Sequence, residues 1–342
     1  MIRFLHSLLF KFVPEINLET NRRFTMQVRV VSFQKHKRLS VVQFLTAQQN
    51  TFEYISGPKA INEDLIQVKE VSQSGSVNNL FLFNLSAKYV FFMDGDILTG
   101  AKQNRVLNTS VMVAPNSKIT LPVSCVEQGR WSAISDKFNT SDYISPQKLR
   151  AKKSRAVEEN LRVERSHMAE QGEVWDDVAS YSIAYKVKSP SMNLSDVFES
   201  KKQDFDEFVK KFPVNHDANG LAIFTDKQLL NVDLFNRTDI YQEYFPKILR
   251  STAMEVSQLK DKGNEITEPE AAFKTVNLFD NLEKIEYTVH SGVGVGEEKR
   301  FDNPELTGFE LNFKNHLIHL TLLNLEKDST GKSDGNRRNR VR

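Results

Sequence analysis

The stretch GAKQNRVLNTSVMVAPNSKITLPVSCVEQGRW, residues 100–131, decides the fold of the N-terminal half of this chain. Its apolar runs are short and rich in Val, Leu and Thr, and Pro115 and Asn116 separate them. Such runs predict β-strands joined by a turn. Four polar residues, Lys102 to Arg105, open the stretch, and Glu127 to Trp131 close it. If the intervening strands pair, these two ends come together.

The same pattern extends outward over residues 28–131. Short apolar runs such as VRVVSF, SVVQFL and NNLFLFNLS alternate with Ser-Gly, Asp-Gly and Pro-Asn turns. We therefore expect an antiparallel meander here. Gly57 and Pro58 predict one short helix within it.

The C-terminal half carries helical periodicity. Pro146 starts a helix with seven Lys or Arg against three Glu over residues 147–168, and its thin apolar stripe predicts a solvated helix or a mobile excursion. Further helices are expected from Ser195 to Phe212, around Tyr241 to Leu259, and from Glu268. Strands are expected at residues 180–187, 219–235 as a hairpin, 284–293 and 307–325. The predicted class is α+β, with strand-rich antiparallel sheets in a sandwich-like arrangement and about four helices, mainly in the second half.

The amino-acid composition limits the class of protein to which this chain can belong. The 342 residues are 39% hydrophobic and 26% charged, which is ordinary for a chain that folds in water. The net charge of +2 is too small for a dedicated nucleic-acid binder, so nucleic acid would be engaged only through the basic helix or the tail. The single cysteine, Cys125, fits a reducing compartment, and we expect a cytoplasmic protein without a membrane partner.

Three segments follow from these patterns. We expect an N-terminal extension at residues 1–25, whose apolar run is interrupted by Lys11 and has no cleavage site after it; the alternative is an apolar cap on the main domain. Residues 26–325 are expected to form a single α+β domain, with the basic helical excursion near residues 146–168. The polar, basic residues 326–342 are expected to be a disordered tail. Oligomeric state does not follow from the sequence.

The two ends of residues 100–131 are the main candidate site. Lys102 and Arg105 suit a phosphate or carboxylate, whereas Gln103 and Asn104 suit amides, riboses or base edges. The alternative is a polar loop with two surface cations. At the far end, Glu127, Arg130 and Trp131 could complete a site, with Glu127 and Arg130 as weak catalytic candidates. Their alternatives are a salt bridge that fixes the loop and ordinary aromatic packing.

Other motifs are weaker candidates. Cys125 could be a nucleophile or a small buried hydrophobe, and the Asp94–Asp96 pair resembles a phosphatase motif but is better explained by a turn. The glycine-rich residues 291–300 predict a close-approach loop with Glu297, Glu298 and Arg300 at its rim, or a flexible hairpin. His316 and His319 lie three apart on an expected strand, which points them to opposite faces, so no metal site is predicted.

Residues 95–110, GDILTGAKQNRVLNTS, and 121–131, LPVSCVEQGRW, resemble the domain family named for its association with ADP-ribosylglycohydrolases and rhodanese-phosphatase proteins, ARPP, first type. The resemblance extends more loosely over residues 51–325. It implies a link to NAD and ADP-ribose metabolism and supplies no catalytic residues.

Three functions remain open on the sequence. The leading hypothesis is a module that binds a nucleotide-like ligand derived from NAD or ADP-ribose, with no other cofactor. Its predicted contacts are Lys102, Gln103, Asn104, Arg105, Glu127, Arg130 and Trp131. One alternative is an enzyme that hydrolyses or transfers a group from such a ligand. The other is an interaction scaffold whose basic helix and tail engage an acidic partner or nucleic acid.

Overall fold

The computed structural model describes residues 26–47, 52–257, 259, 264–282 and 284–325. The extension expected at residues 1–25 and the tail expected at 326–342 both lie outside the described residues. The described part combines three β-sheets with seven helices. The α+β class is therefore confirmed, whereas the expectation of about four helices is wrong.

The largest sheet has eight strands, and every neighbouring pair in it is antiparallel. It joins the first hairpin of the chain to hairpins more than 170 residues later, through the pairing of Gly220 with Phe44. In spatial order its strands are β1 (Val28–His36), β2 (Leu39–Thr46), β12 (Gly220–Thr225), β13 (Gln228–Phe235), β17 (His316–Asn324), β16 (Leu306–Phe313), β15 (Glu297–Asp302) and β14 (Thr288–Ser291).

Two smaller sheets hold the rest of the N-terminal half. The six-stranded sheet has the order β11 (Phe138–Ile144), β7 (Asp96–Gly100), β8 (Arg105–Leu107), β10 (Ser117–Cys125), β5 (Asn79–Asn84) and β4 (Ile66–Glu70). The three-stranded sheet has the order β3 (Tyr54–Ser56), β6 (Tyr89–Phe92) and β9 (Val111–Val113). Because β3 runs parallel to β6, this half is not the uniform antiparallel meander that the turn pattern predicts.

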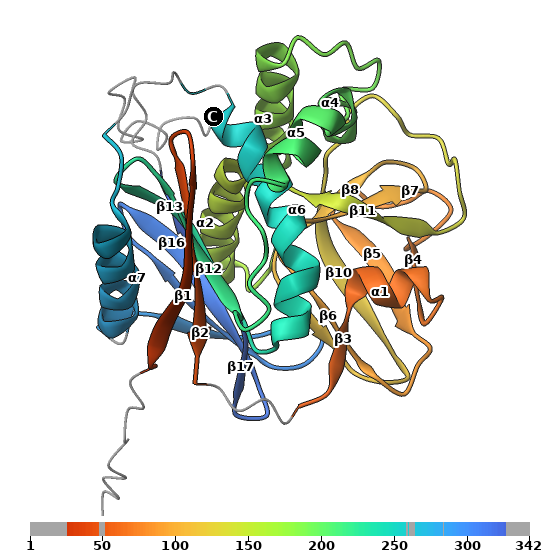
Figure 1. Ribbon diagram of the computed structural model, residues 1–342. Coiled ribbons are helices and arrows are strands. Elements are labelled where there is room, and N and C mark those ends of the chain that lie inside the picture. Colours follow the sequence, from red (N-terminus) through yellow and green to blue (C-terminus); the bar gives the residue numbers. More distant parts are fainter. Residues whose placement is uncertain (1–25, 48–51, 258, 260–263, 283, 326–342) are drawn as a thin grey trace, which may run out of the picture.

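The helices separate the sheets into layers. Figure 1 shows α7 (Glu268–Leu282) on the outer face of the eight-stranded sheet, with α2 (Gln147–Val163) and α6 (Thr238–Val256) between that sheet and the six-stranded one. The arrangement is therefore more layered than a two-sheet sandwich. The remaining helices are α1 (Gly57–Asn62), α3 (Gln171–Ala184), α4 (Leu194–Ser200) and α5 (Lys202–Val209).

Helix α2 lies where the sequence predicts a helix, but it is not solvated. Leu149, Arg150, Lys153 and Glu158 are all buried, so one whole face of the helix is internal. The apolar stripe is thin because charged side chains occupy the buried face and find partners there. Composition alone suggested a solvated excursion, since unpaired charges do not enter a protein interior.

Two other helical assignments differ from the sequence expectations. Residues 180–187 were expected as a strand, but α3 runs to Ala184; Tyr181 packs on the core and Ile183 is 77% exposed. The helix expected from Ser195 to Phe212 is divided at Lys201 into α4 and α5, and Asn193 is its cap. The short helix at Gly57, the hairpin of β12 and β13, and the start of α7 at Glu268 are confirmed.

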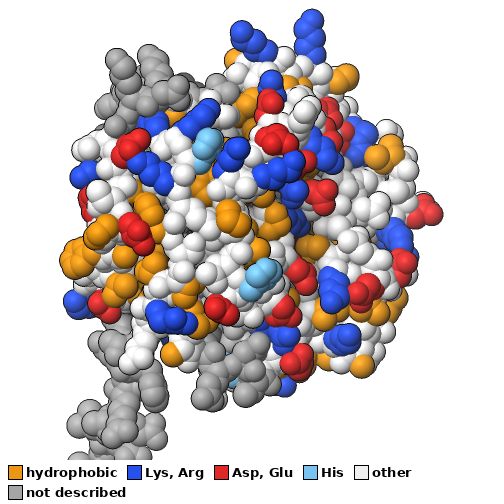
Figure 2. Space-filling view, viewed as in Figure 1, with side chains coloured by type: hydrophobic (Ala, Val, Ile, Leu, Met, Phe, Trp, Pro, Cys, Tyr) orange, Lys and Arg blue, Asp and Glu red, His pale blue; other side chains and the backbone are white. Residues whose placement is uncertain are grey.

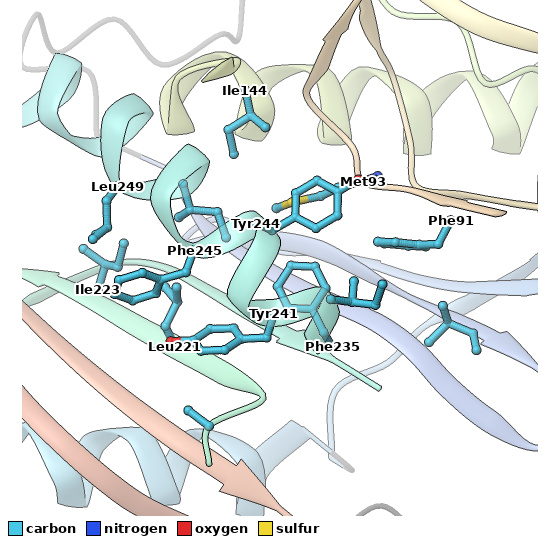
Figure 3. Close-up of a cluster of buried hydrophobic side chains, with 14 of the residues drawn as sticks. Phe91, Met93, Ile144, Leu221, Ile223, Phe235, Tyr241, Tyr244, Phe245 and Leu249 are labelled. Carbon is cyan, nitrogen blue, oxygen red and sulfur yellow. Dashed lines mark hydrogen bonds between the residues drawn. The ribbon is translucent and has the colours of Figure 1, made fainter. Parts of the chain in front are cut away.

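The largest apolar cluster lies against the inner face of the eight-stranded sheet. Figure 3 shows Tyr241, Phe245 and Leu249 of α6 pointing towards Leu221 and Ile223 of the sheet. Pro246 occurs within α6 without ending it. Packing of this kind, rather than helix propensity, holds an amphipathic helix in place. Among the described residues, no helix is long and apolar enough to cross a membrane.

The glycine-rich loop makes the close approach that its sequence predicts. Gly294 forms a bridge with Met112 of β9, and the next residue, Val295, donates its N–H to the Met112 carbonyl at 2.8 Å. A Cβ on Gly294 would lie 2.3 Å from that carbonyl oxygen, and its φ is +83°. This contact ties the C-terminal half to the three-stranded sheet.

We expect Gly294→Ala to lower the free energy of unfolding by about 1 to 3 kcal/mol, because the methyl group meets backbone and the φ angle is strained. Gly172→Ala is the matched control, since a Cβ there has no atom within 4 Å and the residue is helical. It should be neutral or stabilising by up to about 1 kcal/mol. Chemical denaturation of both variants measures the difference, and equal midpoints would contradict the close contact.

Candidate functional site

Strand pairing brings the two ends of residues 100–131 together. Strand β8 pairs with β7 on one side and with β10 on the other, where Arg105 lies opposite Cys125. As a result the residue before β8, Asn104, meets the segment after β10. The Asn104 N–H donates to Glu127 Oε2 at 3.0 Å. The strands pair, and the two ends of residues 100–131 therefore lie together, as the sequence predicts for that case.

The Glu127 carboxylate is fully occupied by donors from the protein. Its Oε1 accepts from Arg130 Nε and Ser191 Oγ, both at 2.8 Å. Its Oε2 accepts from the Asn104 N–H and from Arg130 Nη2 at 2.6 Å. Burial would raise the pKa of Glu127, but the hydrogen bonds from Arg130, Asn104 and Ser191 outweigh burial and keep that pKa below its ordinary value. Four donors fill the acceptor positions of one carboxylate.

The remaining N–H groups of Arg130 donate to backbone carbonyl oxygens, mainly around the loop between β7 and β8. Nη1 donates to the carbonyl oxygens of Ala101 at 2.6 Å and Ser132 at 3.1 Å, and Nη2 reaches Gly100 O at 3.4 Å. The Glu127–Arg130 pair is only 4% and 15% exposed. The pair therefore works as a frame that fixes the shape of this loop.

A concave surface lies over this frame. It is an open pocket of about 380 Å³, which we call the Asn104 pocket. The Asn104 side chain accepts from the Gly100 N–H at 3.0 Å and donates to Asn193 Oδ1 at 3.1 Å, so it joins the loop to the start of α4. The pocket is lined by Thr99, Gly100, Asn104, Glu127, Arg130, Ile134, Ser135, Asn139 and Asn193.

Lys102 and Trp131 are close in sequence to lining residues of the pocket but do not line it themselves; Lys102 is partly exposed and Trp131 is exposed. Trp131 is 46% exposed, and Lys102 Nζ lies 5.5 Å from the centre of its ring. Lys102 has no ion-pair partner among the described residues, although Glu70 accepts from its backbone N–H at 3.4 Å. An uncompensated cation beside an exposed aromatic ring is available to a ligand from solvent.

Gln103 and Arg105 lie behind this surface. Arg105 is fully buried, and it donates to Gln103 Oε1 at 3.0 Å and to Ser76 O at 3.3 Å. Gln103 in turn donates to Gln128 O at 3.3 Å. Neither side chain lines the Asn104 pocket. Both support the loop from inside.

Cys125 has the surroundings of a structural residue. It is buried, its backbone N–H and C=O are both bound by the side chain of Gln171, and burial raises the pKa of its thiol to about 11. A thiol with so high a pKa holds its proton at neutral pH and is a poor nucleophile. The reading as a small buried hydrophobe fits these contacts.

Sequence reasoning missed a buried network of charges around α2. Arg150 donates to Asp94 Oδ2 at 3.0 Å and to Asp233 Oδ1 at 2.6 Å, and all three side chains are at most 5% exposed. Donor atoms of Asp94, Asp233 and His319 lie within 4.8 Å of one another, as metal ligands do. However, the Arg150 guanidinium already supplies the positive charge between the two carboxylates. The cluster therefore fits an ion-pair network better than a metal site.

The charged residues of the glycine-rich loop belong to the interior as well. Glu297, Glu298 and Arg300 were expected at the rim of the loop. Glu297 is exposed, but Glu298 and Arg300 are both fully buried and pair at 3.2 Å. Glu298 also accepts from Thr109 Oγ1 at 3.0 Å. The expectation was wrong because alternation along β15 turns both side chains inward. His316 and His319 lie in a strand, as predicted.

Comparison with known proteins identifies one family. The model of the ARG and Rhodanese-Phosphatase-superfamily-associated Protein domain matches residues 27–323, which include both ends of the candidate site. No curated protein and no solved structure matches the chain.

Proposed function

The chain belongs to the ARG and Rhodanese-Phosphatase-superfamily-associated Protein domain family, and on that premise we propose that it binds a nucleotide-like ligand derived from NAD or ADP-ribose. The observation that carries the proposal is the convergence of three separate segments on the Asn104 pocket: the loop before β8, the segment after β10 and the start of α4. The family description, with its association to ADP-ribosylglycohydrolases, supports the class of ligand.

The accessible groups divide the ligand into parts. Lys102 suits a phosphate, because its ammonium group has no carboxylate partner among the described residues. The exposed ring of Trp131 suits a planar base. Asn139 and Ser135 in the pocket wall offer amide and hydroxyl groups to ribose hydroxyls. Glu127 and Arg130 hold the pocket wall in shape, and we assign them no contact with the ligand.

This division of roles favours binding over catalysis. A general acid or base must exchange a proton with the ligand, but both Glu127 oxygens are occupied and its pKa is lowered. The geometry therefore gives the enzyme alternative no support through Glu127. The scaffold alternative is weakened, since Arg150 and Lys153 of α2 are buried and the more exposed Lys152, Arg155 and Arg162 each pair with a carboxylate. The tail lies outside the described residues.

We expect ADP-ribose or NAD at millimolar concentration to raise the melting temperature of the chain, because a ligand that binds only the folded state stabilises it. The double variant Lys102→Glu/Trp131→Ala should bind at least about tenfold more weakly, through loss of the phosphate and stacking contacts. Lys88→Glu is the control, since this exposed lysine lies in the turn between β5 and β6 and carries the same charge change.

Isothermal titration with NAD, ADP-ribose and AMP gives the affinities. Binding that weakens in the double variant and not in Lys88→Glu supports the proposal. Absence of binding for all three compounds, or equal affinity in the two variants, contradicts it. Glu127 and Arg130 are left intact in this test, because replacing either would disturb the frame of the pocket rather than a ligand contact.

A further inference from the structure

A second pocket lies on another part of the molecule, between the β1–β2 hairpin and the helices α3, α5 and α6. Its volume is about 430 Å³, within the range of small-molecule sites. Lys and Arg side chains gather on the upper part of the face in Figure 2, where Figure 1 places the hairpin tip and α5. We call it the hairpin pocket, and its principal lining residues are His36, Lys37, Tyr185, Lys186, Phe205 and Phe208.

The floor of the hairpin pocket is aromatic. Phe205 is buried, and its ring lies edge-on to that of Tyr185 with centres 6.0 Å apart. His36 is likewise edge-on to Phe208 at 6.0 Å. These contacts fix the rings in place and leave the pocket with a preformed apolar wall. Such a wall binds a planar apolar group with little loss of side-chain entropy.

The rim is positively charged. Lys37 and Lys186 both line the pocket, and neither has an ion-pair partner among the described residues. Lys201 lies 3.8 Å from Asp204, which is 74% exposed and offsets only that one lysine. Arg38 is held by Asp226. Two exposed ammonium groups without an ion-pair partner are therefore among the lining residues of the pocket.

The pKa of His36 responds to the positive charge around the pocket. Burial lowers its pKa below the ordinary value, and the neighbouring charges of Lys37 and Lys211 lower it further. An anion placed at the rim would oppose those two charges and raise the pKa of His36. The imidazole thus provides a direct readout at the site.

We propose that the hairpin pocket binds an organic anion that has a planar apolar body and one phosphate or carboxylate group. The body lies against Phe205 and Phe208, and the anionic group lies between Lys37 and Lys186. The inference goes beyond the proposed function, since it concerns a separate set of residues and a ligand that need not be a nucleotide.

Phenyl phosphate is the probe, with inorganic phosphate and benzyl alcohol as its charged and apolar halves. The ring signals of His36, assigned by comparison with His36→Phe, are followed by NMR as each compound is added to the full chain. We expect saturable shifts with phenyl phosphate, a higher pKa of His36 in its presence, and at least about tenfold weaker binding of either half alone.

The double variant Lys37→Glu/Lys186→Glu should weaken phenyl phosphate binding at least about tenfold, since it places two negative charges beside the anion. Lys88→Glu and Lys102→Glu/Trp131→Ala should leave that binding unchanged, which separates this pocket from the Asn104 pocket. The proposal is overturned if His36 shows no saturable shift, if the halves bind as well as the whole, or if the rim variant binds like the wild type.

Discussion

Arg150→Met is expected to lower the free energy of unfolding by about 3 to 5 kcal/mol, because it leaves Asp94 and Asp233 buried without a counter-charge. Burial would raise the pKa of Asp233, but Arg150 outweighs it and holds that pKa at about 2. The folded-state pKa is thus depressed. Its contribution to stability is present above about pH 4 and is lost as the pH falls towards 2. Denaturation at neutral pH measures the full effect.

Arg155→Met is the matched control, since this arginine is on the same helix and pairs with Asp302 at 3.0 Å while remaining 35% exposed. Exposed pairs of this kind contribute at most about 1 kcal/mol. The triple variant Arg150→Met/Asp94→Asn/Asp233→Asn removes the unpaired charges and should recover part of the loss. If Arg150→Met and Arg155→Met are equally destabilising, the charges around α2 are not isolated from water as the structure shows.

The same network explains which parts of the fold could be predicted. The β12–β13 hairpin is local: Asp226 and Lys227 form its turn, and the alternating apolar residues around them are visible in a short window. Arg150, in contrast, finds Asp94 and Asp233 at separations of 56 and 83 residues. Nothing near Arg150 in the sequence marks it as paired, so its helix was expected to be solvated.

The error in α3 has a local cause. Residues 181–187 place Tyr181, Ile183, Tyr185 and Val187 at every second position, which is typical of a strand. In the helix, Tyr181 and Tyr185 lie four residues apart and face the core together, while Ile183 points to solvent. A run this short fits both the alternating pattern of a strand and the spacing of a helix. The choice is made by packing against the Met254 region of α6, which Tyr185 reaches through its hydroxyl.

The candidate site was partly predictable for the same reason. Asn104 and Glu127 are joined by strands close in sequence, so their convergence follows from one strand pairing. Ser191 comes from a segment 64 residues beyond Glu127, and the sequence offered no signal for it. The partly exposed Lys102 and the buried Arg105 look alike in sequence, and only the structure distinguishes the accessible cation from the internal one.

Lys153 is the second residue whose replacement is expected to change the free energy of unfolding strongly. Its side chain is 2% exposed, and Nζ donates to the Leu107 carbonyl oxygen at 2.6 Å. Burial lowers the pKa of this lysine to about 7, from an ordinary value of 10.5. The neighbouring Asp94 opposes that shift, and Arg150 adds to it. A buried amine with one carbonyl partner is costly to charge.

The sign of the pH dependence follows from that lowered pKa. Below pH 7 both the folded and unfolded states are protonated at Lys153, so the cost of the buried charge is fully present. Between pH 7 and 10.5 only the unfolded state keeps the proton, and stability rises with pH. Above about pH 9 the Cys125 thiol, whose ordinary pKa of 9.0 burial raises to about 11, lowers the stability of the folded chain, so the absolute stability no longer reports Lys153 alone.

We expect the wild type to gain on the order of 2 kcal/mol between pH 7 and pH 9 relative to Lys153→Met, which has no amine to titrate. Urea denaturation of both proteins at several pH values gives the difference, and comparing the two removes contributions from all other groups. At pH 7 and below, Lys153→Met should be the more stable of the two, provided that methionine fills the same space. Parallel pH profiles of the two proteins would contradict this prediction, because they would mean that Lys153 keeps its ordinary pKa in the folded chain. Water or a carboxylate would then have to reach its amine, which the buried contact with the Leu107 carbonyl oxygen does not allow.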